Sequence, residues 1–288
     1  SPRKMAINNY FSGNSVRNTI FPLPAGGLLN SFVSGLPTAG WQMNANPINR
    51  FLRNNPAIKL DWLQEGADGW LAILLGGLGN GQLEFVLAHY QNGQLRIKKR
   101  SEVDQKRSNE FSFCRAVDNK LYIARYSEFI QYDPNSGELK AYAFDLFGGK
   151  PYVIYQLAQT TNDDFWLATS YGLARIQSEP SGYSFTLVEG LRNNNCASIL
   201  VDPTDHNILW VGTKGGGLHR LNTTTMEVSN ISSRDGLPND VIYAVLNDAE
   251  GNLWLSSNKG IINFNPTTKA IRNFTAADGM QSDEFNTH

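Results

Sequence analysis

Apolar and polar residues alternate in short runs along the second half of the chain, and the runs recur every 44 residues. Trp166, Trp210 and Trp254 each lie inside one such run, and a further step of the same length towards the amino terminus reaches Tyr122. Alternation of this kind is typical of a β-strand with one buried face. A repeat in this length range that is built from strands predicts the blades of a β-propeller.

The residues around each aromatic strand extend the unit to four strands. In the last repeat, residues 248–252 supply the Asp, Gly and Asn that a tight turn needs, and the aromatic strand follows them. Gly260 predicts the next turn, residues 261–264 a third strand and residues 271–274 an outer strand. An apolar run at residues 241–246 comes before the first turn and is interpreted as the inner strand. Each repeat is therefore predicted to be one four-stranded antiparallel blade.

We predict an all-β fold, a β-propeller of four-stranded antiparallel blades, with about five to six blades in this chain. The propeller repeats occupy residues 57–288, and Ala72 and Tyr122 take the place of the tryptophan in the front two blades. Residues 1–56 fit the repeat poorly and are interpreted as a divergent blade, a linker or a closing segment. Residues 278–286 resemble a crossing between blades, so we expect the chain to be a fragment of a larger region.

Charge and cysteine content narrow the classes of function. The net charge is −1 and the longest basic run is residues 98–100, so the chain has no electrostatic footprint for nucleic acid or an anionic membrane. The sequence also contains no apolar stretch of about 18 residues, and no membrane segment is expected within it. Cys114 and Cys196 fall on inner strands of blades that are not adjacent, which predicts two buried free thiols.

Three segments resemble the two-component regulator propeller repeat, namely residues 209–218, 235–240 and 250–261. Repeats of this family are found in the periplasmic sensor regions of hybrid two-component systems, especially in Bacteroidetes. The resemblance implies a periplasmic sensor domain of an inner-membrane protein that responds to an oligosaccharide and signals to a histidine kinase elsewhere in that protein. It also implies a homodimer. The front of the chain departs from the family pattern, with Glu128 where glycine is usual.

One face of the predicted propeller carries the candidate ligand-binding residues. The crossings between blades share this face with the loops that join each aromatic strand to the next strand. Amide and charged side chains gather there and suit sugar hydroxyls, while a tyrosine ring is able to stack on a pyranose. The alternative for each Asn or Asp is turn chemistry alone. The candidate residues are Tyr126, Tyr171, Arg192, Asn193, Asn194, Lys214, Asn239, Asp240, Asn258 and Lys259.

The sequence shows no catalytic constellation. Glycoside hydrolysis requires two facing carboxylates about 5 to 9.5 Å apart, and comparable loops offer only Asp240, Asp283 and Glu284. The four histidines are dispersed without the spacing of metal ligands. We therefore predict a chain that is not an enzyme and that holds neither cofactor nor metal. A propeller that binds other proteins without a small-molecule ligand is the alternative function, and a propeller glycosidase or lyase is a weaker one.

Overall fold

The structure is a computed structural model of the chain. It describes residues 20–22, 28–30, 59–65, 70–76, 83–91, 94–103, 111–115, 118–125, 127–160, 163–280 and 282–285. Contacts between residues divide the chain into two compact units, one that contains the strands β1 to β6 and one, Asn109–Asn286, that contains β7 to β22. Within the described ranges the elements are strands and two short 3-10 helices, Ser233–Asp235 and Ala276–Asp278. The prediction of an all-β fold is confirmed.

The first unit contains a two-stranded and a four-stranded antiparallel sheet. The pair consists of β1 (Ile20–Pro22) and β2 (Leu28–Asn30). The larger sheet has the order β3 (Lys59–Glu65), β4 (Trp70–Gly76), β5 (Leu83–Gln91) and β6 (Gln94–Val103). Ala72 lies on β4, the second strand of this sheet, as its place in the repeat predicts. The predicted boundary at residue 56 lies outside the described residues and stays a prediction.

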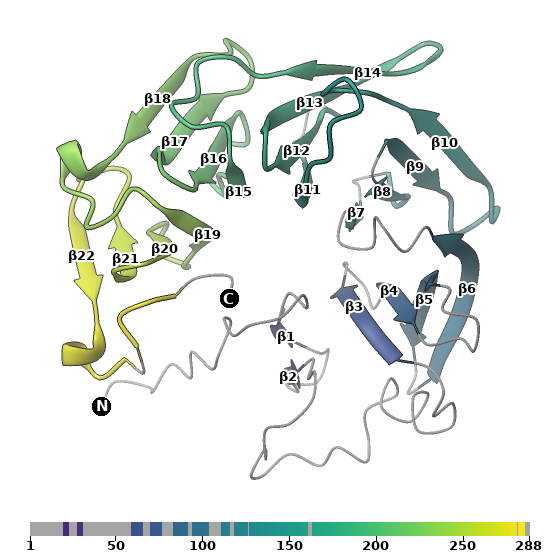
Figure 1. Ribbon diagram of the computed structural model, residues 1–288, viewed down its shortest axis with the longest axis horizontal. Helices are drawn as coiled ribbons and strands as arrows, with labels where there is room; N and C mark the ends of the chain where they lie inside the picture. The colour runs from purple at the N-terminus through teal and green to yellow at the C-terminus, as the bar shows by residue number, and fades with distance from the viewer. Residues whose placement is uncertain are drawn as a thin grey trace. The chain divides into compact units, whose positions relative to one another are not determined.

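The second unit consists of four blades, each a four-stranded antiparallel sheet whose strands follow one another in chain order (Figure 1). With the four-stranded sheet of the first unit, five blades are described, which is the lower of the two predicted counts. The strands of the second unit are β7 (Phe111–Arg115), β8 (Leu121–Arg125), β9 (Glu128–Tyr132), β10 (Leu139–Ala143), β11 (Ile154–Gln159), β12 (Phe165–Thr169), β13 (Gly172–Glu179), β14 (Gly182–Leu187), β15 (Cys196–Val201), β16 (Ile208–Thr213), β17 (Gly217–Asn222), β18 (Val228–Ile231), β19 (Ile242–Asn247), β20 (Leu253–Ser257), β21 (Gly260–Phe264) and β22 (Ile271–Phe274).

The four repeated aromatic residues occupy equivalent places on the second strand of each blade. Tyr122 lies on β8, Trp166 on β12, Trp210 on β16 and Trp254 on β20. Each strand pairs with the inner strand on one side and with the third strand on the other. Each period of 44 residues therefore corresponds to one blade, as predicted.

The aromatic residues fill the interfaces between successive blades. Trp166 is 0% exposed and belongs to an apolar cluster with Leu209 and Leu221 of the next blade. Trp210 is 1% exposed and packs in the same way with Leu253 and Phe264. Full burial of one large apolar side chain stabilises a fold by about 1.5–3 kcal/mol. These interfaces are therefore the main apolar cores of the unit.

Trp254 differs from Trp166 and Trp210, because it is only partly buried. Its ring stacks on Phe274 of its own blade, with centroids 5.5 Å apart. Trp166 and Trp210 are covered by the blade that follows theirs, and within the described residues no blade follows β22. The equivalent cover is therefore missing at Trp254 in the described part of the chain.

A belt of side-chain bonds links the inner strands β7, β11, β15 and β19, which lie innermost in their blades and touch in series (Figure 1). The inner strand has one edge without a partner in its own sheet, so its backbone donors need other acceptors. A side-chain oxygen of each inner strand accepts a bond from the backbone of the next. The bonds run from Leu157 N to Ser112 Oγ at 2.9 Å, from Ile199 N to Gln156 Oε1 at 2.9 Å and from Val245 N to Ser198 Oγ at 3.2 Å.

Cys196 is a buried free cysteine on β15, as predicted. Burial raises the pKa of its thiol to about 12, so the group is a neutral packing element at physiological pH. Cys114 lies on β7, but its side chain is outside the described residues. The prediction of a free thiol there remains untested.

Candidate functional site

The loops between the aromatic strand and the third strand lie beside the crossings between blades. The backbone N–H groups of Gly215 and Gly217 both donate to the carbonyl of Asp240, at 3.0 and 2.8 Å. Lys214 also pairs with Val241 in an isolated β-bridge. The loop after β16 is therefore fixed against the crossing that leads into β19. We call the end of the blades formed by these loops and crossings the crossing face.

Lys214 lies between two tyrosine rings on this face. Its ammonium nitrogen is 4.5 Å from the ring centroid of Tyr155 and 5.4 Å from that of Tyr243. It also donates a hydrogen bond of 3.2 Å to the Tyr155 hydroxyl. Tyr155 belongs to β11 and Tyr243 to β19, so the lysine bridges the inner strands on both sides of its own blade. We call Lys214, Tyr155, Tyr243 and Asn258 the lysine cluster.

Both tyrosines are placed by a β-bulge at the start of their inner strand. The register shifts between Ile154 and Gln156 in β11 and between Ile242 and Ala244 in β19, so that Tyr155 and Tyr243 are the extra residues at the shifts. A bulge re-aims the extra side chain. The equivalent extra residue in β15 is Ala197. The blade that carries Lys214 therefore has a small side chain at the bulge where the blades on both sides have a tyrosine.

Asn258 completes the lysine cluster. The Tyr243 hydroxyl donates to Asn258 Oδ1 at 3.0 Å. Asn258 comes four residues after Trp254, just as Lys214 comes four residues after Trp210. In the blade before that of Lys214, the residue four places after Trp166 is Ser170. Its hydroxyl accepts a hydrogen bond of 2.9 Å from Val153 N. The fourth position after each tryptophan therefore contacts the start of an inner strand.

Turn chemistry occupies the oxygens of three predicted site residues. Asn193 Oδ1 accepts a bond of 2.7 Å from Asn195 N, and Asn239 Oδ1 accepts one of 2.8 Å from Val241 N. The Asp240 carboxylate accepts bonds from the backbone and the hydroxyl of Ser233, the second at 2.8 Å. These contacts hold the crossings in shape. These oxygens therefore have the turn role that was the alternative to ligand binding. The role of the three residues in ligand binding stays a prediction.

The remaining predicted residues are exposed or lie outside the described residues. Tyr171 is 50% exposed, and its ring centroid is 5.7 Å from that of Phe147 in the preceding crossing. Tyr171 comes five residues after Trp166. Lys259 comes five residues after Trp254 and is also exposed. Three other candidates complete the set: Arg192 and Asn194 are exposed in their crossing, and Tyr126 lies outside the described residues.

His219 holds the backbone of the crossing that contains Arg192. It is fully buried on β17, and its Nε2 accepts a bond of 3.1 Å from the backbone N–H of Arg192. Burial, and then the charge of Arg192, lower the pKa of His219 to about 4. The imidazole is therefore neutral at physiological pH and acts as an acceptor for the crossing backbone.

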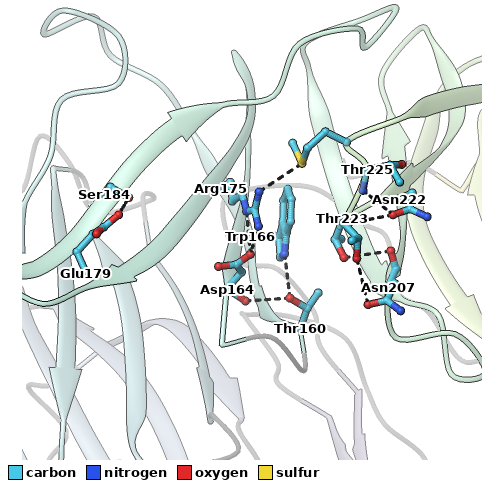
Figure 2. Close-up of polar contacts among 12 residues, drawn as sticks. Thr160, Asp164, Trp166, Arg175, Glu179, Ser184, Asn207, Asn222, Thr223 and Thr225 are labelled. Atoms are coloured by element: carbon cyan, nitrogen blue, oxygen red, sulfur yellow. Dashed lines mark hydrogen bonds and ion pairs between the residues drawn. The ribbon is translucent and has the colours of Figure 1, made fainter.

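The opposite end of the blades carries a different kind of polar contact, shown in Figure 2. Arg175 Nε donates to Asp164 at 2.8 Å, and the guanidinium lies 5.5 Å from the Trp166 ring centroid. The Trp166 indole N–H donates to the Thr160 hydroxyl at 3.2 Å. Arg175 also reaches the Met226 sulfur of the next blade at 3.6 Å. These groups satisfy one another and fix the packing of two blades, so we assign them a structural role.

Three further features of the described residues bear on other functions. No group of three or more His, Cys, Asp or Glu in the described part of the chain is placed to hold a metal ion. A shallow pocket beside β9 and β10 lies at the turn end of its blade, away from the lysine cluster, and its lining is mostly charged: Lys120, Gln131, Asp133, Glu138 and Lys140. No helix in the described ranges is long and apolar enough to cross a membrane.

The sequence comparisons agree with the resemblance seen in the repeats. Residues 236–259 match the family model of the two component regulator propeller. A segment of 74 residues is 40% identical to histidine kinase P4 of Formosa agariphila, which covers 26% of this chain and 5% of that protein. The predicted resemblance is therefore confirmed. The chain spans only a small fraction of this relative, so the activity of the whole protein remains a matter for proposal.

Solved structures with the same fold come from proteins of different function. The extracellular domains of two Bacteroides thetaiotaomicron proteins, a hybrid two-component system and a one-component system, align with TM-scores of 0.56 and 0.54 at 18% and 15% identity. They cover 77% and 79% of this chain, which spans 29% and 34% of them. Virginiamycin B lyase of Staphylococcus aureus aligns with a TM-score of 0.56 at 14% identity, over 92% of this chain and 78% of the lyase. These likenesses establish the propeller fold.

Proposed function

We propose that this chain is part of the extracytoplasmic sensor region of a hybrid two-component signalling protein and that it responds to an oligosaccharide. The observation that carries the proposal is the match of residues 236–259 to the two component regulator propeller, together with the 40% identity to a histidine kinase. Two structural relatives are described as extracellular domains, which supports a periplasmic location. The kinase itself would lie elsewhere in the full-length protein.

The crossing face is the proposed ligand-binding surface. It offers an ammonium group at Lys214, a guanidinium at Arg192 and amide groups at Asn193 and Asn258, which are donors for sugar hydroxyls. The exposed ring of Tyr171 lies at the same end of its blade. A rigid set of blades with polar loops at one end is the arrangement that a binding scaffold requires.

Two of the three acidic residues in these loops, Asp240 and Asp283, argue against hydrolysis. Asp240 uses its carboxylate to hold Ser233, and Asp283 Oδ1 accepts a bond of 2.7 Å from Ala276 N in the next crossing. Both carboxylates therefore serve the same repeated turn. A glycosidase needs two carboxylates free to face a substrate. We accordingly propose a non-enzymatic role, although a lyase shares the fold.

The proposal is tested by the response of the full-length protein in membrane vesicles. Autophosphorylation is measured across a panel of oligosaccharides for wild type, for Tyr171→Ala and for Glu138→Ala. Glu138 is a matched exposed residue in the turn between β9 and β10, at the opposite end of the blades. The expected result is a rise with one glycan class, weakened at Tyr171 and unchanged at Glu138. A protein that binds no glycan and gains mass with concentration in light scattering would instead be an interaction module.

A further inference from the structure

We propose that Lys214, held between Tyr155 and Tyr243, binds an acidic group of the ligand, so that the sensed molecule is an anionic oligosaccharide that carries a carboxylate or a sulfate. The inference rests on the proposed function and names its substrate class. It starts from the charge of Lys214. No carboxylate among the described residues lies within the 4.0 Å of an ion pair from this ammonium, whereas Lys120, Arg125, Lys140 and Arg175 all have one.

The tyrosine rings hold the ammonium without neutralising it. A ring attracts a cation through its quadrupole but carries no net charge. At 4.5 and 5.4 Å from the two centroids, the nitrogen of Lys214 is placed by both rings and keeps its full positive charge. An ammonium group has three N–H donors, and the Tyr155 hydroxyl takes one of them. Among the described residues the ammonium has no second hydrogen-bond acceptor, so two donors remain for an anionic one.

The backbone of Lys214 is fixed before any ligand binds. Its N–H donates to the Asn195 carbonyl at 2.9 Å, and it forms the bridge with Val241. The next turn is tied to Asp240 through Gly215 and Gly217. A charged group on a rigid base loses less conformational entropy when it binds its partner. The lysine is therefore pre-organised.

The acid beside Val241, the bridge partner of Lys214, is already hydrogen-bonded. Asp240 directs its carboxylate to the backbone and the hydroxyl of Ser233, so both of its oxygens are bonded elsewhere. The same bond to the first residue of a 3-10 helix recurs at Asp283 and Ala276. Because this contact belongs to the repeat, Asp240 is fixed away from Lys214 by the turn. The positive charge is left for a ligand.

The other polar group of the lysine cluster is also a donor. Asn258 uses its side-chain oxygen to accept from the Tyr243 hydroxyl, which leaves its NH₂ group without a partner among the described residues. The cluster thus presents N–H donors from Lys214 and Asn258. Carboxylate and sulfate oxygens accept such bonds, and bonds to charged groups are the stronger ones. The tyrosine rings add apolar area for the sugar that carries the acid.

Calorimetric titration of the full-length protein tests the inference with three probes: a uronic-acid oligosaccharide, the same oligosaccharide with its carboxylates reduced to alcohols, and a neutral oligosaccharide bearing O-sulfate. The uronic or the sulfated probe should bind at least tenfold more tightly than the reduced one, and this difference identifies which acid is read. Lys214→Gln should lower the affinity for that acidic probe by about ten- to a hundredfold, the range of a charged hydrogen bond.

Lys269→Gln is the matched control. This lysine also lies over an aromatic ring, 5.8 Å from the centroid of Phe264, but in the turn between β21 and β22 at the opposite end of the blade. It should leave the affinity within about twofold, the scatter expected of a surface change. Thermal unfolding of both variants identifies any loss of fold. Tyr155→Phe separates the two contacts of Tyr155 with Lys214, because it keeps the ring and removes the hydroxyl.

Three results would overturn the inference. Equal affinity for the acidic probe and its reduced counterpart, unchanged in Lys214→Gln, would leave glycan sensing in place and remove the acid-binding role of Lys214. Failure of every probe to bind, with the protein folded, would remove both the acid-binding role and the proposed carbohydrate function. Inorganic sulfate is titrated alone, and binding of sulfate as tight as that of the oligosaccharide would also contradict the inference.

Discussion

The indole N–H of Trp210 donates a hydrogen bond of 2.8 Å to Asp202, a residue of the turn that precedes its strand. Trp254 makes the same bond to Asp248 at 2.9 Å, and the Tyr122 hydroxyl lies 3.2 Å from Asp118. In each of the four blades of the second unit the aromatic residue therefore joins the apolar interface to the polar turn. Burial opposes ionisation of Asp202, but bonds from Trp210 and from Thr204 outweigh it and hold the pKa of this carboxyl below its usual value.

Replacement of Trp210 by alanine should lower the free energy of unfolding by about 3–5 kcal/mol, because it removes a buried aromatic side chain and leaves a cavity. Trp254→Ala should cost less, since Trp254 is only partly buried. The measurement is chemical denaturation of both variants beside wild type. A larger loss at Trp254 than at Trp210 would contradict the packing described between the blades.

His219 predicts a loss of stability in mild acid. Its pKa is about 4 in the folded protein and about 6.5 in an unfolded chain. As the pH falls below 6.5 the unfolded state takes up the proton first, so stability is complete above that pH and falls towards pH 4. The full shift corresponds to about 3 kcal/mol.

The variant His219→Gln should show a flatter dependence of the unfolding free energy between pH 6.5 and 4, because it removes the titrating group. Denaturation midpoints across this range give the slope. His206→Gln is the control, since His206 is exposed in a turn. An identical slope in wild type and His219→Gln would show that another group causes the acid sensitivity.

The belt between inner strands predicts a local effect at one amide. Ser198→Ala removes the acceptor of Val245 N and the donor to Gln156, and should cost about 1–3 kcal/mol because a buried donor is left unpaired. Hydrogen exchange at the Val245 amide should become faster. Ser184→Ala is the control, because Ser184 bonds only to an exposed Glu179. Unchanged exchange at Val245 would exclude the bond from Ser198.

Two glycines with nearly the same φ allow the cost of backbone strain to be separated from the cost of a steric clash. Gly217 and Gly251 have φ of 81° and 82°, where a side chain costs about 1–2 kcal/mol. A Cβ at Gly217 would lie 2.2 Å from the Ile231 carbonyl oxygen, whereas one at Gly251 would meet nothing within 4 Å. Gly217→Ala should therefore destabilise the protein clearly more than Gly251→Ala in thermal unfolding. Equal losses would mean that β17 and β18 adjust at no cost.

The repeat predicted most of the fold because the residues that determine the strands and turns of one blade recur in the next. The tryptophans marked the second strands, and Gly172 and Gly260 marked the tight turns that follow them. Four strands were predicted for each blade, but the residues of the outer strand β14 (Gly182–Leu187) were not identified, because its side chains are only partly buried or exposed and its apolar pattern is weak. The partial exposure of Trp254 depends on what covers it, which its own repeat does not encode.

The lysine cluster was only partly predictable. Lys214 and Asn258 were identified from their loops, but Tyr155 and Tyr243 were missed as parts of apolar inner strands. The signal was present, since these tyrosines are two periods apart, with Ala197 in the equivalent place between them. What the sequence could not supply is the bulge that turns each tyrosine towards the lysine. Bulges depend on register across two strands rather than on local composition.

Hydrogen exchange of the full-length protein, with and without the glycan that activates it, tests most directly whether the crossing face binds the ligand. The account predicts slower exchange in residues 190–195, 214–217, 236–241 and 258–259, where crossings and loops meet. The turns at residues 133–138, 202–207 and 248–252 should exchange at an unchanged rate. Protection confined to those turns, or protection absent from this chain while the glycan still activates the protein, would contradict the account.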